Sequence, residues 1–273
     1  MHAAGSLPFA CRNIRRVDAS PRMEPLVSAA AAVEEIKLLS LAPRLRADAA
    51  FYRTHLILPL LAAAALLLLL ERMGGNRWIA DQIFALGDGH WVLKKHVITS
   101  FWIHPGGKYF CLALWFAALI VWWRSRSLPS LSSWRGPLAY LLWSTFLATG
   151  LVSALKLLTH MDCPWDMQGY GGLRPYFGLF DARPAALRAS GCFPSGHASA
   201  GYAWVALYFF FASVAPRWRF AGLWIGLLLG AIFGISQQLR GAHFASHDVA
   251  SLLLCWLTAL ILFIAVRRRW GLS

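Results

Sequence analysis

The chain has 273 residues, and its composition excludes an ordinary soluble globular protein. Hydrophobic residues make up 58% and charged residues 14% of the chain, whereas about a quarter of the residues in a soluble domain are charged. The net charge of +14 could suit a nucleic-acid partner, but the basic residues gather at the ends of apolar segments, which argues against one.

Residues 1–50 are predicted to form a cytoplasmic N-terminal tail that is partly disordered. The basic start is followed by no adequate apolar core and no convincing cleavage site, which argues against a signal peptide. Residues 51–273 are predicted to form one membrane domain, because no linker or repeat divides them.

Six apolar windows in this domain approach the roughly 20 residues that cross a bilayer. They are Leu56–Leu70, Tyr109–Trp123, Pro137–Leu158, Ala198–Val214, Phe220–Leu239 and Val249–Val266. Because lipid does not tolerate exposed sheet edges, the sequence predicts an all-α integral membrane protein, a bundle of six transmembrane helices.

The first long loop between the windows, Glu71–Lys108, mixes aromatic and aliphatic residues with polar ones. This pattern predicts an amphipathic helical segment lying on the membrane surface. A lid packed over the helix bundle would show the same pattern, and both interpretations stay open.

The arginines indicate the orientation. If six spans alternate, the basic residues between and beyond them share one side, which the positive-inside rule makes cytoplasmic, together with both termini. They are Arg124, Arg126, Arg135, Arg217, Arg219, Arg267, Arg268 and Arg269. The short basic loops favour a bacterial inner (plasma) membrane, whose periplasmic side then receives the long loops.

Two cysteines, Cys163 and Cys192, share one loop on the predicted periplasmic side. Disulfides persist in that compartment, and a bridge would tie both ends of the loop together. Spacing alone does not establish the bridge.

Three polar clusters fall at the same end of the predicted spans. The first runs from Lys156 to Arg174, the second is Ser195-Gly196-His197, and the third runs from Ser236 to Asp248. Ionisable groups beside membrane spans are costly and usually functional. The fold can bring the three clusters together, which predicts a site within residues 156–248.

These residue types suit phosphoryl transfer. Cationic side chains and helix-start amides can hold phosphate oxygens, while one histidine attacks phosphorus and another protonates the leaving oxygen. The carboxylates Asp162, Asp166 and Asp248 are scattered along the sequence. We therefore expect catalysis without a metal ion or other cofactor, through a phosphohistidine.

The three clusters resemble the motifs of the type 2 phosphatidic acid phosphatase (lipid phosphate phosphatase) superfamily. That family has Lys, six residues, Arg-Pro; then Pro-Ser-Gly-His; then Ser-Arg, five residues, His, three residues, Asp. Here the middle block is complete as Pro194-Ser195-Gly196-His197. The first block has Cys163 where arginine is expected after Lys156, and the third has Gln237 for arginine and His247 for aspartate.

The resemblance implies a role for each matching residue. His243 would be the nucleophile and His197 the acid, while Lys156, Ser195 and the Gly196 amide would bind phosphate. Arg240 and Arg174 are nearby replacements for the missing arginines. Either His247 or Asp248, one residue beyond the expected aspartate, would orient the nucleophile.

The resemblance implies an integral membrane phosphatase of an atypical subgroup. Family substrates include phosphatidic acid, phosphatidylglycerol phosphate, polyprenyl diphosphates and lipid A. Two alternatives stay open: a lipid phosphotransferase that uses the same intermediate, and a catalytically silent lipid-phosphate-binding protein or transporter, which the missing charges would suit.

Overall fold

The structure is a computed structural model that describes residues 48–179, 181–182, 184, 190–267 and 270. These residues belong to one compact unit, Asp48–Ser273. The predicted N-terminal tail lies outside the described residues up to Ala47, and its last three residues, from Asp48 on, are helical.

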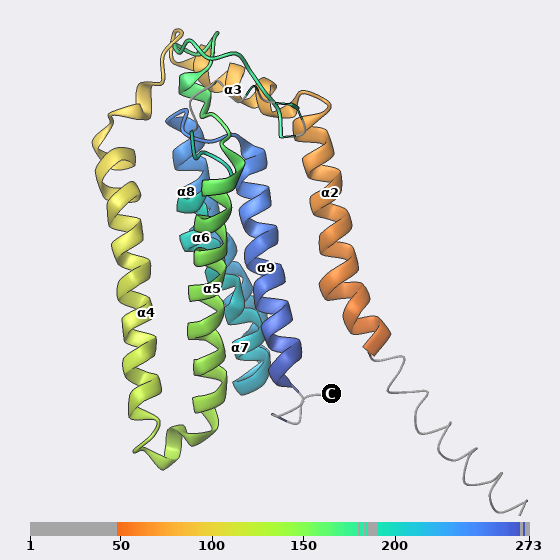
Figure 1. Cartoon of the computed structure of the whole chain (residues 1–273). Coiled ribbons are helices and arrows are strands. Elements are labelled where there is room, and N and C mark those ends of the chain that lie inside the picture. Colours follow the sequence, from red (N-terminus) through yellow and green to blue (C-terminus); the bar gives the residue numbers. More distant parts are fainter. Residues whose placement is uncertain (1–47, 180, 183, 185–189, 268–269, 271–273) are drawn as a thin grey trace, which may run out of the picture. The chain divides into compact units, whose positions relative to one another are not determined.

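The described part of the chain is helical, and its main helices run side by side (Figure 1). The helices in chain order are α2 (Leu58–Glu71), α3 (Gly75–Leu86), α4 (Gly107–Arg124), α5 (Arg135–Thr159), α6 (Gly196–Tyr202), α7 (Leu207–Val214), α8 (Arg219–Leu239) and α9 (Ala245–Arg267). The predicted all-α class is confirmed.

Five helical stretches among the described residues are long and apolar enough to cross a membrane, as expected of a multi-pass membrane protein. They are Asp48–Glu71, Ile98–Arg124, Pro129–Asp166, Pro216–Leu239 and Ala245–Arg267. The predicted span at 198–214 is helical throughout, but a 3-10 turn, Ala203–Ala206, divides it into α6 and α7. It is also the most enclosed segment, since Ala203–Ala206 are all buried.

The close packing of α6 and α8 explains the enclosure of this segment. The glycines Gly222, Gly226, Gly230 and Gly234 recur every four residues on α8 and are all buried. A Cβ atom on Gly226 would lie 2.3 Å from the Val205 nitrogen, and one on Gly230 would lie 2.0 Å from the Tyr202 ring. Small residues at this spacing let helix backbones approach closely in a membrane.

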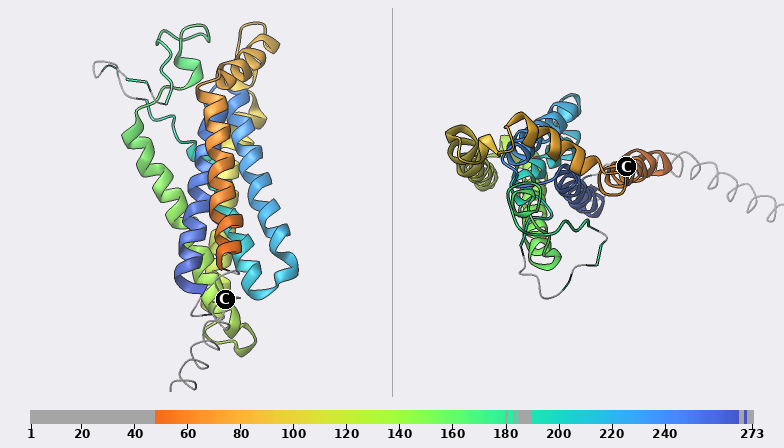
Figure 2. Two further views of the ribbon diagram at one scale, coloured as in Figure 1. Left: turned by 90° about the vertical axis from the view of Figure 1, so that its right-hand side faces the viewer. Right: turned by 90° about the horizontal axis from the view of Figure 1, so that it is seen from above.

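The remaining helices attach to this centre through polar contacts inside the bundle. On α5, the Tyr140 hydroxyl donates to the Ala259 carbonyl of α9 at 3.0 Å. The Trp256 indole of α9 donates to the His55 carbonyl at 2.7 Å, just before α2. In apolar surroundings these donors need partners, so the contacts help to specify which helices are neighbours (Figure 2).

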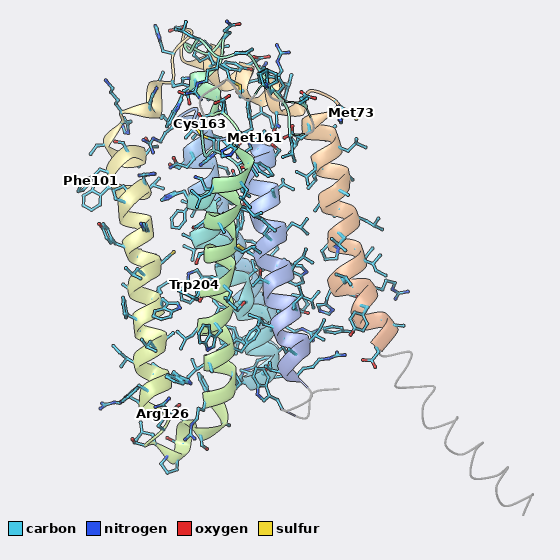
Figure 3. The ribbon with its side chains drawn as sticks, viewed as in Figure 1. Met73, Phe101, Arg126, Met161, Cys163 and Trp204 are labelled. Carbon is cyan, nitrogen blue, oxygen red and sulfur yellow. A yellow bond between two sulfur atoms is a disulfide. The ribbon has the colours of Figure 1, made fainter. Side chains whose placement is uncertain are left out.

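The two ends of the bundle differ. Cys163 and Met161 lie at one end with α3, and Arg126 lies at the other (Figure 3). We call the first the loop end and the second the basic end. The predicted alternation of spans therefore places the long loops together and away from the arginine-rich turns.

Helix α3 lies over the loop end. Its buried Asn76 donates to the Ser246 hydroxyl at 2.8 Å and accepts from the Ser246 amide at 3.1 Å. Ala80 packs with Met167 and Phe244, while Trp78 on another face is 65% exposed. The helix is thus amphipathic as predicted, and its contacts with the start of α9 favour the lid over the purely surface-lying helix.

Candidate active site

Three chain segments bring the predicted site residues to the loop end. Lys156 is in the last turn of α5, His197 is in the first turn of α6, and His243 is in the turn between α8 and α9. The Lys156 charge acts on both His197 and His243. The structure therefore brings one residue from each of the three sequence clusters into electrostatic range of the others.

His243 and His247 form a buried pair. Their Nδ1 atoms are 3.3 Å apart, and the two rings meet edge to face with centroids 5.5 Å apart. One Nδ1 must donate and the other accept. If His243 donates, its Nε2 keeps a free lone pair, which is the state that a nucleophile needs.

Electrostatics favour an uncharged His243. Burial, followed by the charges of His247 and Lys156, holds the pKa of His243 well below its usual 6.5. Removing a charged imidazole from water is costly, and nearby cations add to that cost. His243 is therefore neutral at neutral pH.

His197 is held by a helix from a distant part of the chain. Its Nε2 donates to the Ile103 carbonyl at 3.1 Å, and its ring lies against Phe233 of α8 with centroids 5.2 Å apart. With Nε2 bound to a carbonyl, Nδ1 is the ring nitrogen that can exchange a proton with a substrate.

His104, which none of the sequence motifs includes, stacks on His197. The ring centroids are 4.7 Å apart and the planes differ by 25°. His104 belongs to a π-helical segment, Ile98–Gly106, with Pro105 inside it. Such segments often occur at functional sites, and a histidine beside Pro-Gly-Gly at the edge of an apolar window is the sequence signal that could have drawn attention to it.

Ser195 and Gly196 begin α6 as the middle motif predicts. Ser195 is fully buried and its Oγ accepts from the Ala198 amide at 3.4 Å, so it caps the helix. A Cβ atom on Gly196 would lie 3.3 Å from Cδ and 3.5 Å from Nζ of Lys156. The first turn of α6 and the Lys156 ammonium therefore face the same space.

Asp248 is hydrogen-bonded to residues other than His243. Its Oδ2 accepts from the Gln238 amide at 2.6 Å, and the Ser195 hydroxyl is also within hydrogen-bonding reach of its carboxylate. Of the two residues that could orient the nucleophile, His247 is the one in contact with His243. Asp248 instead joins α8, α9 and the start of α6.

Gln237 and Arg240 form a pair near the position where the family has arginine. Arg240 Nη1 donates to Gln237 Oε1 at 3.0 Å, and Arg240 Nε donates to the Lys94 carbonyl at 3.3 Å. The Arg240 charge also reaches His197. Arg240 thus supplies a guanidinium to the site from one helical turn beyond the expected position.

Arg174 is placed differently from Arg240. Its guanidinium forms an ion pair with the buried carboxylate of Asp162 and a hydrogen bond with the Ser190 hydroxyl. These contacts join the two ends of the loop that contains Cys163 and Cys192. In this structure the Arg174 guanidinium is engaged by Asp162, and it stabilises the loop.

Cys163 and Cys192 are joined by a disulfide with a Cα–Cα distance of 5.3 Å. The carbonyl of Cys192 lies beside both the His243 and His247 rings, while its amide donates to Met161 at 3.0 Å. The disulfide therefore fixes the position of the Cys192 carbonyl beside the two histidine rings.

Reducing this disulfide should destabilise the loop end. A bridge closing a loop of this length (29 residues of sequence separation) contributes about 2–4 kcal/mol. We expect the double variant Cys163→Ala/Cys192→Ala to melt at a lower temperature than the wild type in detergent, by nanoscale differential scanning fluorimetry. Dithiothreitol should lower the melting temperature of the wild type but not that of the double variant. An equal shift in melting temperature in both proteins would contradict the stabilising role of the disulfide.

The described residues contain no group of three or more His, Cys, Asp or Glu side chains arranged to hold a metal ion. The groups gathered here are instead one ammonium, one guanidinium, helix-start amides and the four imidazoles of His104, His197, His243 and His247. Such a set can bind a phosphate dianion and move a proton.

Comparison with known proteins agrees with this arrangement. The family model described as the PAP2 superfamily matches residues 137–271, a range that includes Lys156, His197 and His243. No curated protein and no solved structure matches the chain. Over these residues, the chain belongs to the PAP2 superfamily.

Proposed function

We propose that this protein is a membrane phosphatase that hydrolyses a phosphomonoester or diphosphate on a lipid through a phosphohistidine at His243. The observation that carries the proposal is the meeting of His243, His197 and Lys156 at one end of a bundle of membrane-spanning helices. Family membership supports phosphatase chemistry, and an apolar bundle presents the site to lipids.

In the first step, Nε2 of His243 attacks phosphorus. The new P–N bond forms as the P–O bond to the lipid breaks, and His197 gives the proton on its Nδ1 to the leaving oxygen. His197 enters this step as the imidazolium, which the negative charge of the bound phosphate favours. Lys156, Arg240 and the Gly196 amide stabilise the charge on the phosphoryl oxygens. Holding donors where charge develops is the main contribution that a protein makes to this reaction.

In the second step, water attacks the phosphohistidine. His197 accepts a proton from the water, the P–N bond breaks, and inorganic phosphate leaves. His247 keeps the His243 ring oriented in both steps through the contact between their Nδ1 atoms. A neutral imidazole stabilises the charge on His243 less than a carboxylate would.

The direct experiment measures phosphate release from a panel of lipid phosphates in detergent, with and without EDTA. We expect activity to survive EDTA, because the described site holds phosphate with cationic side chains. Loss of all activity in EDTA, recovered by a divalent metal ion, would contradict the metal-independent mechanism. Phosphate that appears on an added acceptor lipid instead of in solution would identify a phosphotransferase.

The pH profile should reflect the state of His243. Its pKa lies well below 6.5, and only the neutral imidazole attacks, so acidification through pH 6.5 should leave the nucleophile active. We therefore expect the acidic limb of kcat/KM to lie below pH 6.5, with the activity falling only at lower pH. The assay covers pH 4 to 8 with circular dichroism as a folding control, and an acidic limb above pH 6.5 would refute the assignment.

We also propose that the loop end faces the periplasm of a bacterial inner membrane. The basic end carries the arginines that the positive-inside rule assigns to the cytoplasm, and a disulfide suits an oxidising compartment. Both termini would then be cytoplasmic.

Cysteine labelling of intact cells tests this orientation. Leu173 at the loop end is 89% exposed and Trp218 at the basic end is 51% exposed. We expect a membrane-impermeant maleimide to label Leu173→Cys in intact cells and Trp218→Cys only after the cells are opened. The reverse labelling pattern would contradict this orientation and indicate that the basic end faces the periplasm.

A further inference from the structure

Gln237 is a buried amide near the end of α8 that the proposed mechanism does not use. Only 2% of its surface is exposed. Its Nε2 is buried and has no hydrogen-bond partner among the residues that the structure describes. Leaving a buried donor without a partner is costly, and such groups are rare in folded proteins. The amide of Gln237 therefore calls for a functional explanation.

Arg240 determines which branch of this amide carries the free donors. Its Nη1 donates to Oε1 of Gln237 at 3.0 Å. A guanidinium has donors and no acceptor, so the atom of Gln237 that it contacts must be the oxygen. The Nε2 group of Gln237 is therefore the branch that does not face Arg240, and both of its hydrogens are available to an acceptor.

The packing of α6 against α8 shows where Gln237 lies. A Cβ atom on Gly201 would lie 2.4 Å from the Gly230 nitrogen, and closer to the loop end the His197 ring lies against Phe233. Toward the loop end, residue numbers thus fall along α6 and rise along α8, so the two helices are antiparallel. Gln237 follows Phe233 by one helical turn on the same face of α8, which places it level with the first residues of α6.

The groups at this level are hydrogen-bond donors. Gly196 begins α6, and a Cβ atom on it would lie 3.5 Å from Nζ of Lys156. The Arg240 charge reaches His197, and the amide of Gln237 adds two donors without charge. A tetrahedral oxyanion accepts hydrogen bonds from several sides at once and suits this set, whereas a cation or an apolar group would leave the donors unpaired.

We propose that Nε2 of Gln237 donates a hydrogen bond to a phosphoryl oxygen of the substrate, and that Arg240 positions the amide for this contact. The inference rests on the proposed function and names a further residue that binds the substrate. Where the family has a guanidinium, this chain places a neutral amide in contact with the phosphate. The guanidinium of Arg240 holds that amide from one turn further along the chain.

Orthovanadate, a tetrahedral oxyanion that resembles phosphate, tests this contact without turnover. Isothermal titration calorimetry in detergent compares the wild type with Gln237→Met, which keeps the length of the side chain and removes its donors. We expect the variant to bind orthovanadate roughly tenfold to hundredfold more weakly, because one hydrogen bond to a charged group is lost. Unchanged affinity in Gln237→Met would overturn the proposal.

Gln237→Glu separates substrate binding from a merely structural role. A glutamate keeps an acceptor for Arg240 and converts the contact into an ion pair, so the melting temperature should not fall. The carboxylate has no donor and repels an oxyanion, so the affinity for orthovanadate should fall further than in Gln237→Met. A retained affinity in Gln237→Glu would show that Gln237 serves only to hold Arg240, and would overturn the proposal.

Gln238→Met is the matched control, because it removes a side-chain amide at the neighbouring position. In the structure that amide donates to Asp248 at 2.6 Å, so its loss should lower the melting temperature and leave the affinity for orthovanadate close to that of the wild type. A loss of affinity in Gln238→Met as large as in Gln237→Met would mean that binding depends on the packing of α8 in general, and would contradict a direct contact by Gln237.

The outcome is separable from that of the proposed function. Hydrolysis of lipid phosphates that depends on His243, combined with unchanged orthovanadate affinity in Gln237→Met, would refute only the role of Gln237. Orthovanadate binding that is weakened in Gln237→Met, without hydrolysis of any lipid phosphate, would support the oxyanion contact and contradict the phosphatase.

Discussion

Replacing His243 by alanine is expected to reduce phosphate release from a lipid phosphate by roughly 10³-fold or more, because the attacking nitrogen is lost. His243 is buried, neutral and in contact with His247 through Nδ1, which leaves its Nε2 as the nitrogen that attacks phosphorus. The measurement is initial-rate phosphate release in detergent with a saturating lipid substrate.

His247→Ala is the matched comparison for this variant. It removes the orienting ring but leaves the nucleophile, so the loss of kcat should be clearly smaller than for His243→Ala. A greater loss in His247→Ala, with a retained melting temperature in both variants, would identify His247 as the nucleophile. Full activity in His243→Ala would refute the phosphohistidine assignment.

Replacing His197 by alanine is expected to lower the rate by roughly 10²–10⁴-fold on a lipid phosphate, the usual contribution of a general acid. The size of the loss should depend on the leaving group. An alkoxide needs a proton to leave, whereas nitrophenolate leaves without one, so formation of the phosphoenzyme from p-nitrophenyl phosphate should be much less affected.

Burst kinetics separate this acid role from a merely structural one. In His197→Ala, nitrophenol release in the first turnover should stay close to the wild-type rate, while lipid phosphate cleavage is slow. His104→Ala is a useful comparison, since it removes the stacked ring but keeps the acid. Equal losses with the lipid and the aryl substrate in His197→Ala would contradict the assignment of His197 as the acid.

Much of the fold follows from local sequence patterns. Apolar windows of bilayer length predict the membrane helices, and the amphipathic pattern of 71–108 predicts helix α3. The 3-10 turn at Ala203–Ala206 was not predicted, because it reflects close packing of this segment on the glycines of α8, which are distant in sequence. The docking of α3 through Asn76 and Ser246 was not predicted either, because these two residues are far apart in the sequence.

The candidate site was predictable only as far as its motifs are continuous in sequence. The pattern Pro-Ser-Gly-His and the spacing of Lys156 and His243 identify three residues that the fold brings together. His104 was missed, since its contact with His197 joins residues 93 positions apart and follows no motif. Arg174 and Asp248 looked equivalent to site residues in the sequence, but the structure pairs Arg174 with the buried Asp162 and Asp248 with the half-buried Gln238.

The covalent intermediate is the most direct test of the mechanism. Purified protein is mixed with a ³²P-labelled lipid phosphate, quenched with alkali after a few milliseconds and digested, and the labelled peptide is sequenced by mass spectrometry. The mechanism predicts an alkali-stable, acid-labile phosphate on His243 that appears at the rate of lipid release and is absent from His243→Ala. Turnover of the lipid with no labelled histidine, or with the label on His197 or His247, would contradict it.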